Sequence, residues 1–170
     1  MRRRDRLFLV YKFMTKNGPF KILLFPYRFR QKDGAPFDLE FAVVKKKVEN
    51  HWQALAGQAQ ANEFPMDSAI RSAKEALGIP SHFIFFQLDS KAMIPVEYII
   101  EDQWGDDIVV IPETCYAVNI PYDFNFLLAD YFESVQWLPY KEAIEVVKWD
   151  SNKTALWELK YRIISKKIRM

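Results

Sequence analysis

Apolar and polar positions alternate along two segments near the start of the chain. Residues 20–30 are rich in Phe, Ile and Leu, and residues 37–46 have one clearly apolar face and one mixed face. Alternation with a period of two is typical of half-buried strands. The polar segment 31–36 between them contains Gly and Pro, the usual turn residues. The pattern predicts a β-hairpin that leads into a loop around Trp52.

A different spacing follows in residues 66–77. There the apolar positions fall on one face of a helix: Ala69, Ile70, Ala73 and Leu77. Pro65 stands near the expected first turn, Asp67 suits the positive end of the helix dipole, and Gly78 lies just beyond the end. The segment is therefore predicted to form an amphipathic helix.

The remaining patterns complete an α/β arrangement. Strands are predicted at residues 83–88, 92–100, 108–118 and 131–138, and helices at residues 141–147 and 152–164. Polar breaks at residues 89–91 and 101–107 separate the middle strands. The order of strands, one helix, strands and then helices predicts a mixed sheet with helices on both faces. We expect one domain spanning residues 1–170.

Composition agrees with a folded protein that does not cross a membrane. Half of the 170 residues are apolar, 16% are aromatic, and no run approaches the roughly 18 apolar residues that a bilayer span needs. The first residues do not form a convincing signal peptide, because Tyr11 and Lys12 interrupt the apolar stretch 7–10. The single Cys115 suits a reducing compartment and a buried strand. These features predict a cytoplasmic protein.

The net charge of +2 is too small to indicate nucleic-acid binding by itself. Basic residues gather at both ends of the chain: Arg2, Arg3, Arg4, Arg6, Lys160, Arg162, Lys166, Lys167 and Arg169. We interpret them as a flexible N-terminal end at residues 1–6 and a solvated helix face. A polyanion-binding role is the less favoured alternative.

The segment 57–79 places charged residues at fixed offsets: Gly57, Glu63, Arg71, Glu75 and Gly78. This spacing resembles the Nudix box, in which a glycine, a glutamate six residues later and an Arg-Glu-x-x-Glu-Glu-x-Gly run build a magnesium site for pyrophosphate cleavage. Two box glutamates are replaced by Ser72 and Ala76, and Gln58 replaces a loop glycine. The resemblance therefore supports the Nudix fold more strongly than it supports the Nudix activity.

Three other segments extend the resemblance over residues 20–164. They are 51–57, 111–118 and 149–159, which resemble the bacterial dATP and dihydroneopterin triphosphate pyrophosphatase-like branch of the Nudix family. The resemblance implies the Nudix fold, a mixed β-sheet sandwiched between helices (α/β/α). It also implies a magnesium-dependent pyrophosphohydrolase acting on a nucleoside triphosphate or another nucleoside diphosphate-linked compound.

The same resemblance assigns candidate site residues. Their roles would be catalysis (Glu75, Arg71 and Glu63), substrate binding (Gly57 and Trp52) and metal binding (Glu75, Glu63 and Glu133). Magnesium takes hard oxygen ligands, and helix positions 72, 75 and 76 share one turn. With only one of those three positions acidic, we expect Mg²⁺ or Mn²⁺ to bind weakly.

Several alternatives stay open from sequence. The chain is either a hydrolase or a catalytically inactive Nudix scaffold that binds a nucleotide or a partner. The charges near the box would otherwise form an ordinary surface ion-pair network of small energy. His51 and His82 are isolated from Cys, which argues against zinc. One apolar set fits either a core or a homodimer interface, with the core favoured: Trp104, Phe124, Phe126, Leu127 and Leu128.

Overall fold

The computed structural model describes residues 18–30, 38–60, 62–99 and 107–168. Within these ranges the elements are β1 (Lys21–Arg30), β2 (Asp38–Lys46), β3 (Trp52–Gln53), β4 (Leu55–Gln58), α2 (Pro65–Leu77), β5 (Phe85–Pro95), the 3₁₀ turn η1 (Val96–Tyr98), β6 (Val110–Asn119), β7 (Phe132–Pro139), α3 (Tyr140–Val146) and α4 (Asp150–Ile164). The basic segment 1–6 and Trp104 lie outside the described residues.

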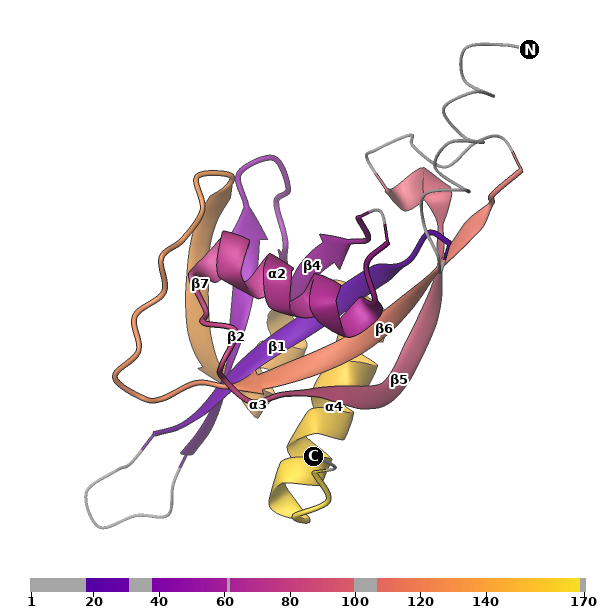
Figure 1. Cartoon of the computed structure of the whole chain (residues 1–170). Helices are drawn as coiled ribbons and strands as arrows, with labels where there is room; N and C mark the ends of the chain where they lie inside the picture. Colours follow the sequence, from indigo (N-terminus) through magenta and orange to yellow (C-terminus); the bar gives the residue numbers. More distant parts are fainter. Residues whose placement is uncertain (1–17, 31–37, 61, 100–106, 169–170) are drawn as a thin grey trace.

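All described strands belong to one mixed sheet, in the order β3-β2-β1-β6-β5, with β4 paired to β1 and β7 paired to β2. The β1–β6 pair is parallel, whereas the β1–β2, β1–β4 and β5–β6 pairs are antiparallel. Figure 1 shows α2 crossing one face of the sheet, with α3 and α4 on the other side. The predicted α/β/α architecture and the β1–β2 hairpin are therefore confirmed.

Two hydrophobic clusters hold these layers together. The first fills the space between α2 and the sheet and includes Ile22, Leu24 and Tyr116. The second packs α3 and α4 against the opposite face and includes Leu23, Phe25 and Cys115. Consecutive residues of β1 thus point to opposite clusters, as strand geometry requires. Burial raises the pKa of the Cys115 thiol to about 12, so this side chain is structural.

The segment around Trp52 differs from its prediction as a loop. Residues 52–53 pair with β2, and residues 55–58 pair with β1 in the register Ile22↔Gly57. Strands of two and four residues are too short to show a reliable period, so only pairing with β2 and β1 defines them. The consequence is that Gly57 lies within a strand, held against the centre of the sheet.

The predicted break at residues 89–91 is also wrong as a strand boundary. Residues 85–95 form one strand, β5, and its register against β6 shifts between Gln87 and Lys91. At this irregularity the backbone N–H groups of Asp89 and Ser90 donate to the carboxylate of Glu158, each at 2.7 Å. A distant side chain on α4 therefore accepts bonds from the irregular segment and lets the strand continue.

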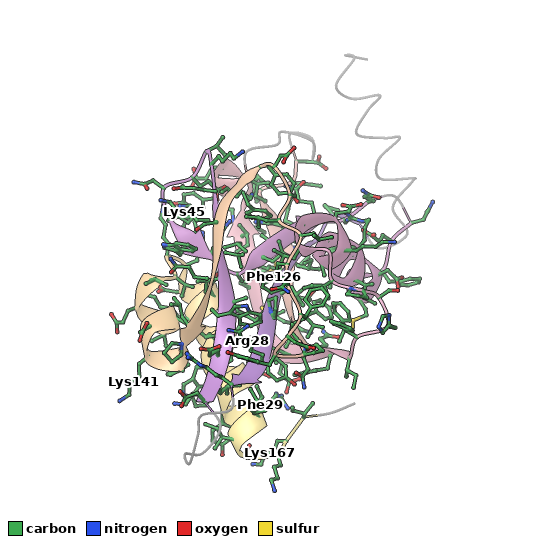
Figure 2. The ribbon with its side chains drawn as sticks, turned by 90° about the vertical axis from the view of Figure 1, so that its left-hand side faces the viewer. Arg28, Phe29, Lys45, Phe126, Lys141 and Lys167 are labelled. Carbon is green, nitrogen blue, oxygen red and sulfur yellow. The ribbon has the colours of Figure 1, made fainter. Side chains whose placement is uncertain are left out.

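The aromatic segment before β7 belongs mainly to the core. Phe124, Phe126 and Leu128 pack against the first cluster, whereas Leu127 is exposed. The ring of Phe126 stacks on Trp137 at 5.1 Å between centroids, and the Arg28 guanidinium lies 4.3 Å from the centre of the same indole (Figure 2). The favoured core role is thus confirmed for three of these residues. Among the described residues, no helix has the length and hydropathy to span a membrane.

Candidate functional site

The box residues surround the start of α2. The helix begins with Pro65 at its first turn and ends at Gly78, whose φ of 68° is readily adopted by glycine. Before the helix, the Glu63 carboxylate accepts two hydrogen bonds from Arg71, at 2.7 and 3.0 Å. Arg71 also donates to the backbone carbonyl of Gln58 at 2.8 Å. One guanidinium therefore ties the loop, the helix and the end of β4 together.

This brace sets the charge state of Glu63. Burial by itself would raise the pKa of the carboxyl group, but hydrogen bonds from Arg71 and from the Gln60 N–H together hold the pKa below its usual value. Only 11% of the Glu63 side chain is exposed, so the pair is more enclosed than an ordinary surface ion pair. The Glu63 carboxylate therefore holds the loop in place through its hydrogen bonds to Arg71 and to the Gln60 N–H.

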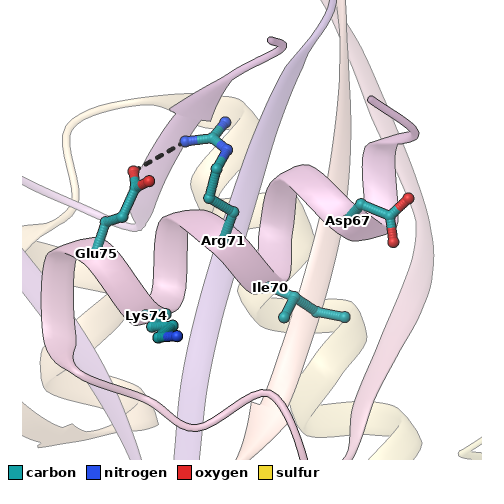
Figure 3. Close-up of a pocket in the computed structure, with 5 residues that line it drawn as sticks. All are labelled: Asp67, Ile70, Arg71, Lys74 and Glu75. Carbon is teal, nitrogen blue, oxygen red and sulfur yellow. Dashed lines mark hydrogen bonds and ion pairs between the residues drawn. The ribbon is translucent and has the colours of Figure 1, made fainter. Parts of the chain in front are cut away.

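Glu75 lies one helical turn further along and has a different environment. Its side chain is 56% exposed and accepts a hydrogen bond from Arg71 at 3.0 Å. Figure 3 shows this contact along one side of α2, with Asp67 near the opposite end of the helix. The five side chains drawn there, from Asp67 to Glu75, line a shallow surface depression.

The two replaced box positions point inward. Ser72 and Ala76 are both buried, and Ala76 belongs to the first hydrophobic cluster. A Cβ atom added to Gly57 would lie 2.2 Å from Oγ of Ser72. The small residues at these positions therefore allow α2 to pack closely on β4.

Glu133, the third residue assigned to metal binding, stands on β7. Its side chain is half-exposed and forms an ion pair of 3.2 Å with Lys45, which is labelled in Figure 2. Within the described ranges, no group of three or more His, Cys, Asp or Glu side chains gathers closely enough to hold a metal ion. The donor set described here does not fit a multi-carboxylate magnesium site, and a metal role for Glu75, Glu63 and Glu133 stays a prediction.

Replacing Arg71 with methionine is expected to lower the free energy of unfolding by about 1–2 kcal/mol. The change removes the charge-assisted bonds to Glu63 and the bond to the Gln58 carbonyl. Lys74→Met is the matched control, because Lys74 is an exposed cation on the same helix. Urea unfolding of both variants would measure the difference. Equal losses in the two variants would mean that the brace adds nothing.

A cavity of about 300 Å³ lies beside the box on the other face of β4. Its walls come from six strands, β1 to β6, from the loop between β2 and β3, from η1 and from the start of α4: Lys21, Leu23, Lys46, Glu49, His51, Gln53, Ala56, Ile94, Pro95, Tyr98, Glu113, Trp149, Asp150, Ser151 and Asn152. Ala56 lines the cavity and is followed directly by Gly57, which packs on α2. The strand thus connects the cavity to the box.

The cavity combines buried polar groups with an aromatic wall. Glu113 is 3% exposed, and burial raises the pKa of its carboxyl group despite the neighbouring Lys21. Burial in turn lowers the pKa of the Lys21 ammonium. Trp149 contributes its indole, which lies 6.1 Å from the ring of Tyr98 and donates to Gln53 Oε1 at 3.3 Å. Polar groups that converge beside an aromatic wall are typical of small-molecule sites.

Trp52 does not line this cavity. It packs partly buried against the second cluster and bridges to Val147, while its neighbours His51 and Gln53 reach the cavity wall. The aromatic side chain beside the cavity is instead Trp149, which lies 97 positions later in the chain. A role for Trp52 in contacting substrate stays a prediction, and its present contacts are those of a core residue.

Lys21 was not identified as a site residue from the sequence, and Glu113 was considered only as one of several acidic residues that could serve as substitute metal ligands. Glu113 and Lys21 are far apart in the chain, yet they are directly paired positions of the parallel strands β6 and β1. The one available signal was that each is a charged residue inside or beside an otherwise apolar strand pattern. A charged residue in an apolar strand is expected to have a polar partner, but the sequence does not identify that partner.

No protein-family model and no curated protein matches this chain. Several solved structures are similar to this chain. A provisionally assigned NUDIX hydrolase from Listeria monocytogenes has a TM-score of 0.76 and 26% identity, covering 89% of this chain and 98% of that one. The E. coli dihydroneopterin triphosphate pyrophosphohydrolase has a TM-score of 0.68 and 14% identity, covering 83% of this chain and 95% of that one.

The NUDIX domain of Shewanella oneidensis NrtR, solved in complex with ADP ribose, gives a TM-score of 0.64 at 12% identity and covers 96% of this chain and 99% of that one. These similarities confirm the expected resemblance to the Nudix family. The chain has the Nudix fold.

Proposed function

We propose that this chain, which has the Nudix fold, binds a nucleotide-type small molecule with its heterocycle in the cavity beside β4. The observation that carries the proposal is the cavity of about 300 Å³, where an indole and buried polar groups converge. Planar rings are well suited to such a wall, because aromatic faces stack favourably and polar atoms at the ring edge find partners.

The phosphate end of the ligand would point toward the box loop. Ala56 on the cavity wall and Gln58, which Arg71 holds, are two residues apart on β4. Lys46 stands at the cavity and offers positive charge. Of the relatives reported above, NrtR was solved with ADP ribose, a ligand that combines a heterocycle with a diphosphate.

Pyrophosphate hydrolysis is the second candidate function. The fold supports a pyrophosphohydrolase, and the E. coli relative is described as one. Two observations favour it: the Glu63–Arg71 brace holds the box loop, and the exposed Glu75 carboxylate remains available to solvent. Against it stand the buried Ser72 and Ala76, which supply no carboxylate. Binding of Mg²⁺ or Mn²⁺ should accordingly be weak.

Calorimetry with a panel of nucleoside triphosphates is expected to detect binding to the natural protein. Ala56→Leu should weaken that binding at least 10-fold, because the added carbons occupy the cavity that the ring would fill. A circular dichroism melt must show that the variant folds. Glu142→Gln, an exposed change on α3, serves as the control and should bind normally.

Phosphate and pyrophosphate release, measured with Mg²⁺ or Mn²⁺ on the same panel, separates the two candidate functions. Turnover that is abolished by Glu75→Gln supports hydrolysis, whereas binding without turnover supports the binding protein. Absence of binding to every nucleotide would refute both. Strong binding to heparin or DNA that falls steeply with salt would favour the polyanion alternative instead.

A further inference from the structure

Two buried side-chain atoms in the described part of the chain have no hydrogen-bond partner: Nε2 of His51 and Oε1 of Glu113. Both residues line the same cavity. A buried polar atom without a partner costs about 1–3 kcal/mol, so native folds rarely leave one unsatisfied. His51 Nε2 lies 3.5 Å from Glu49 Oε2, so Glu113 Oε1 is the atom that most needs a partner, and a ligand in this cavity can supply the missing bond.

Glu113 offers acceptor capacity in this cavity. Its carboxylate accepts a hydrogen bond from the Ser151 hydroxyl. The oxygen Oε1 accepts no hydrogen bond from the described part of the protein. The neighbouring Lys21 favours the ionised form of Glu113. In that form the carboxylate has acceptors only, and its two oxygens can take two adjacent N–H groups of one ligand. The groups that match it best are therefore neighbouring N–H donors at the edge of a ring.

Lys21 offers the complementary donor. It faces Glu113 across the β1–β6 pair and lines the same cavity. Adjacent strands lie about 4.8 Å apart, so one planar ring edge can contact both side chains. The cavity therefore presents two acceptor oxygens on β6, from Glu113, beside one donor group on β1, from Lys21.

We propose that Glu113 is a specificity-determining residue that selects a heterocycle with a guanine-type edge, in which an amino group and a ring N–H stand beside a carbonyl oxygen. The N–H groups would donate to Glu113, and the carbonyl would accept from Lys21. Adenine presents an unprotonated ring nitrogen where guanine has N–H, and this lone pair would face the carboxylate. A site built for hydrogen-bond donors rejects a ligand that lacks them.

This inference rests on the proposed function, and calorimetry with three probes tests it: GTP, ITP, which lacks the amino group, and ATP. Phosphonate-bridged analogues replace them if turnover occurs. We expect GTP to bind at least 10-fold more tightly than ATP, with ITP between them. In Glu113→Gln, an NH₂ donor group replaces one of the two acceptor oxygens, so the ratio of GTP to ATP affinity should fall close to one, while Glu142→Gln should preserve the ratio.

Two results would overturn the inference while leaving the proposed function in place: equal binding of the three probes by the natural protein, or an unchanged GTP preference in Glu113→Gln. Failure of all three probes to bind would overturn the proposed function as well. If Glu113→Gln does not fold, as judged by its melting transition, the order of the three probes on the natural protein decides the question alone.

Discussion

Replacing Gly57 with alanine is expected to destabilise the fold by about 1–3 kcal/mol. The new Cβ would lie 2.2 Å from Oγ of Ser72, 3.0 Å from its Cβ and 3.2 Å from Cδ1 of Ile22. None of these atoms belongs to a long flexible side chain, and Ile22 and Ser72 are both buried. Either β4 must move away from α2 or the helix must shift, and both changes open the first hydrophobic cluster.

The loss can be assigned to this contact with a double-mutant cycle. Ser72→Ala removes the nearest atom, so the pair Gly57→Ala and Ser72→Ala together should lose less stability than the sum of the single changes. Urea unfolding of all four proteins gives the coupling energy. A coupling energy of zero would show that the Ser72 side chain is not the reason why position 57 requires glycine.

Replacing Glu158 with alanine is expected to cost about 2–4 kcal/mol of stability. Oε1 accepts bonds from the Asp89 N–H at 2.7 Å and from Arg162 Nε at 2.6 Å. Oε2 accepts from the Ser90 N–H at 2.7 Å and from the Ser90 hydroxyl. Removing the carboxylate leaves two backbone donors of β5 and a mostly buried guanidinium without this partner. Glu145→Ala, an exposed change on α3, is the control.

The same residue predicts a pH dependence. Burial by itself would raise the pKa of the Glu158 carboxyl group, but hydrogen bonds from Ser90, Asp89 and Arg162 hold the pKa below its usual value. A lowered pKa in the folded state means that the stabilisation is complete above the carboxyl pKa of the unfolded chain, about 4.3, and is lost as pH falls. Glu158→Gln should therefore reduce the steepness of acid destabilisation.

Unfolding free energies of the natural protein and of Glu158→Gln, measured from about pH 6 down to pH 3, check this expectation. Glu63, whose pKa is also lowered, and Glu113, whose pKa is raised, are present in both proteins, so their contributions cancel in the difference. The gap between the two proteins should narrow as pH falls. A gap that is constant over this range would contradict the prediction.

Local sequence was sufficient for elements whose own residues carry the pattern. The helix predicted at residues 66–77 is α2, because a proline start, a glycine end and an apolar face all lie inside one segment. The short strands β3 and β4 carry no such pattern and exist through pairing with β2 and β1. The continuity of β5 through Asp89 likewise depends on Glu158, whose position in the chain gives no hint of that contact.

The site divides in the same way. The box loop was located from spacing, and the structure adds that Glu63 and Arg71 brace it while Ser72 and Ala76 are buried. The cavity was not located, because its walls come from six separate parts of the sheet and from the start of α4. Trp149 lines this cavity, and Trp52 packs into the core instead.

Sequence by itself determined the α/β/α layers, the helix of the box and its depleted set of acidic residues, because periodicity and residue identity are local properties. Tertiary structure alone decided which charges meet. The pairing of β1 with β6 brings Lys21 beside Glu113, and the packing of α2 on β4 sets Ser72 against Gly57. Such contacts depend on strand register and helix packing, which bring together residues that are distant along the chain.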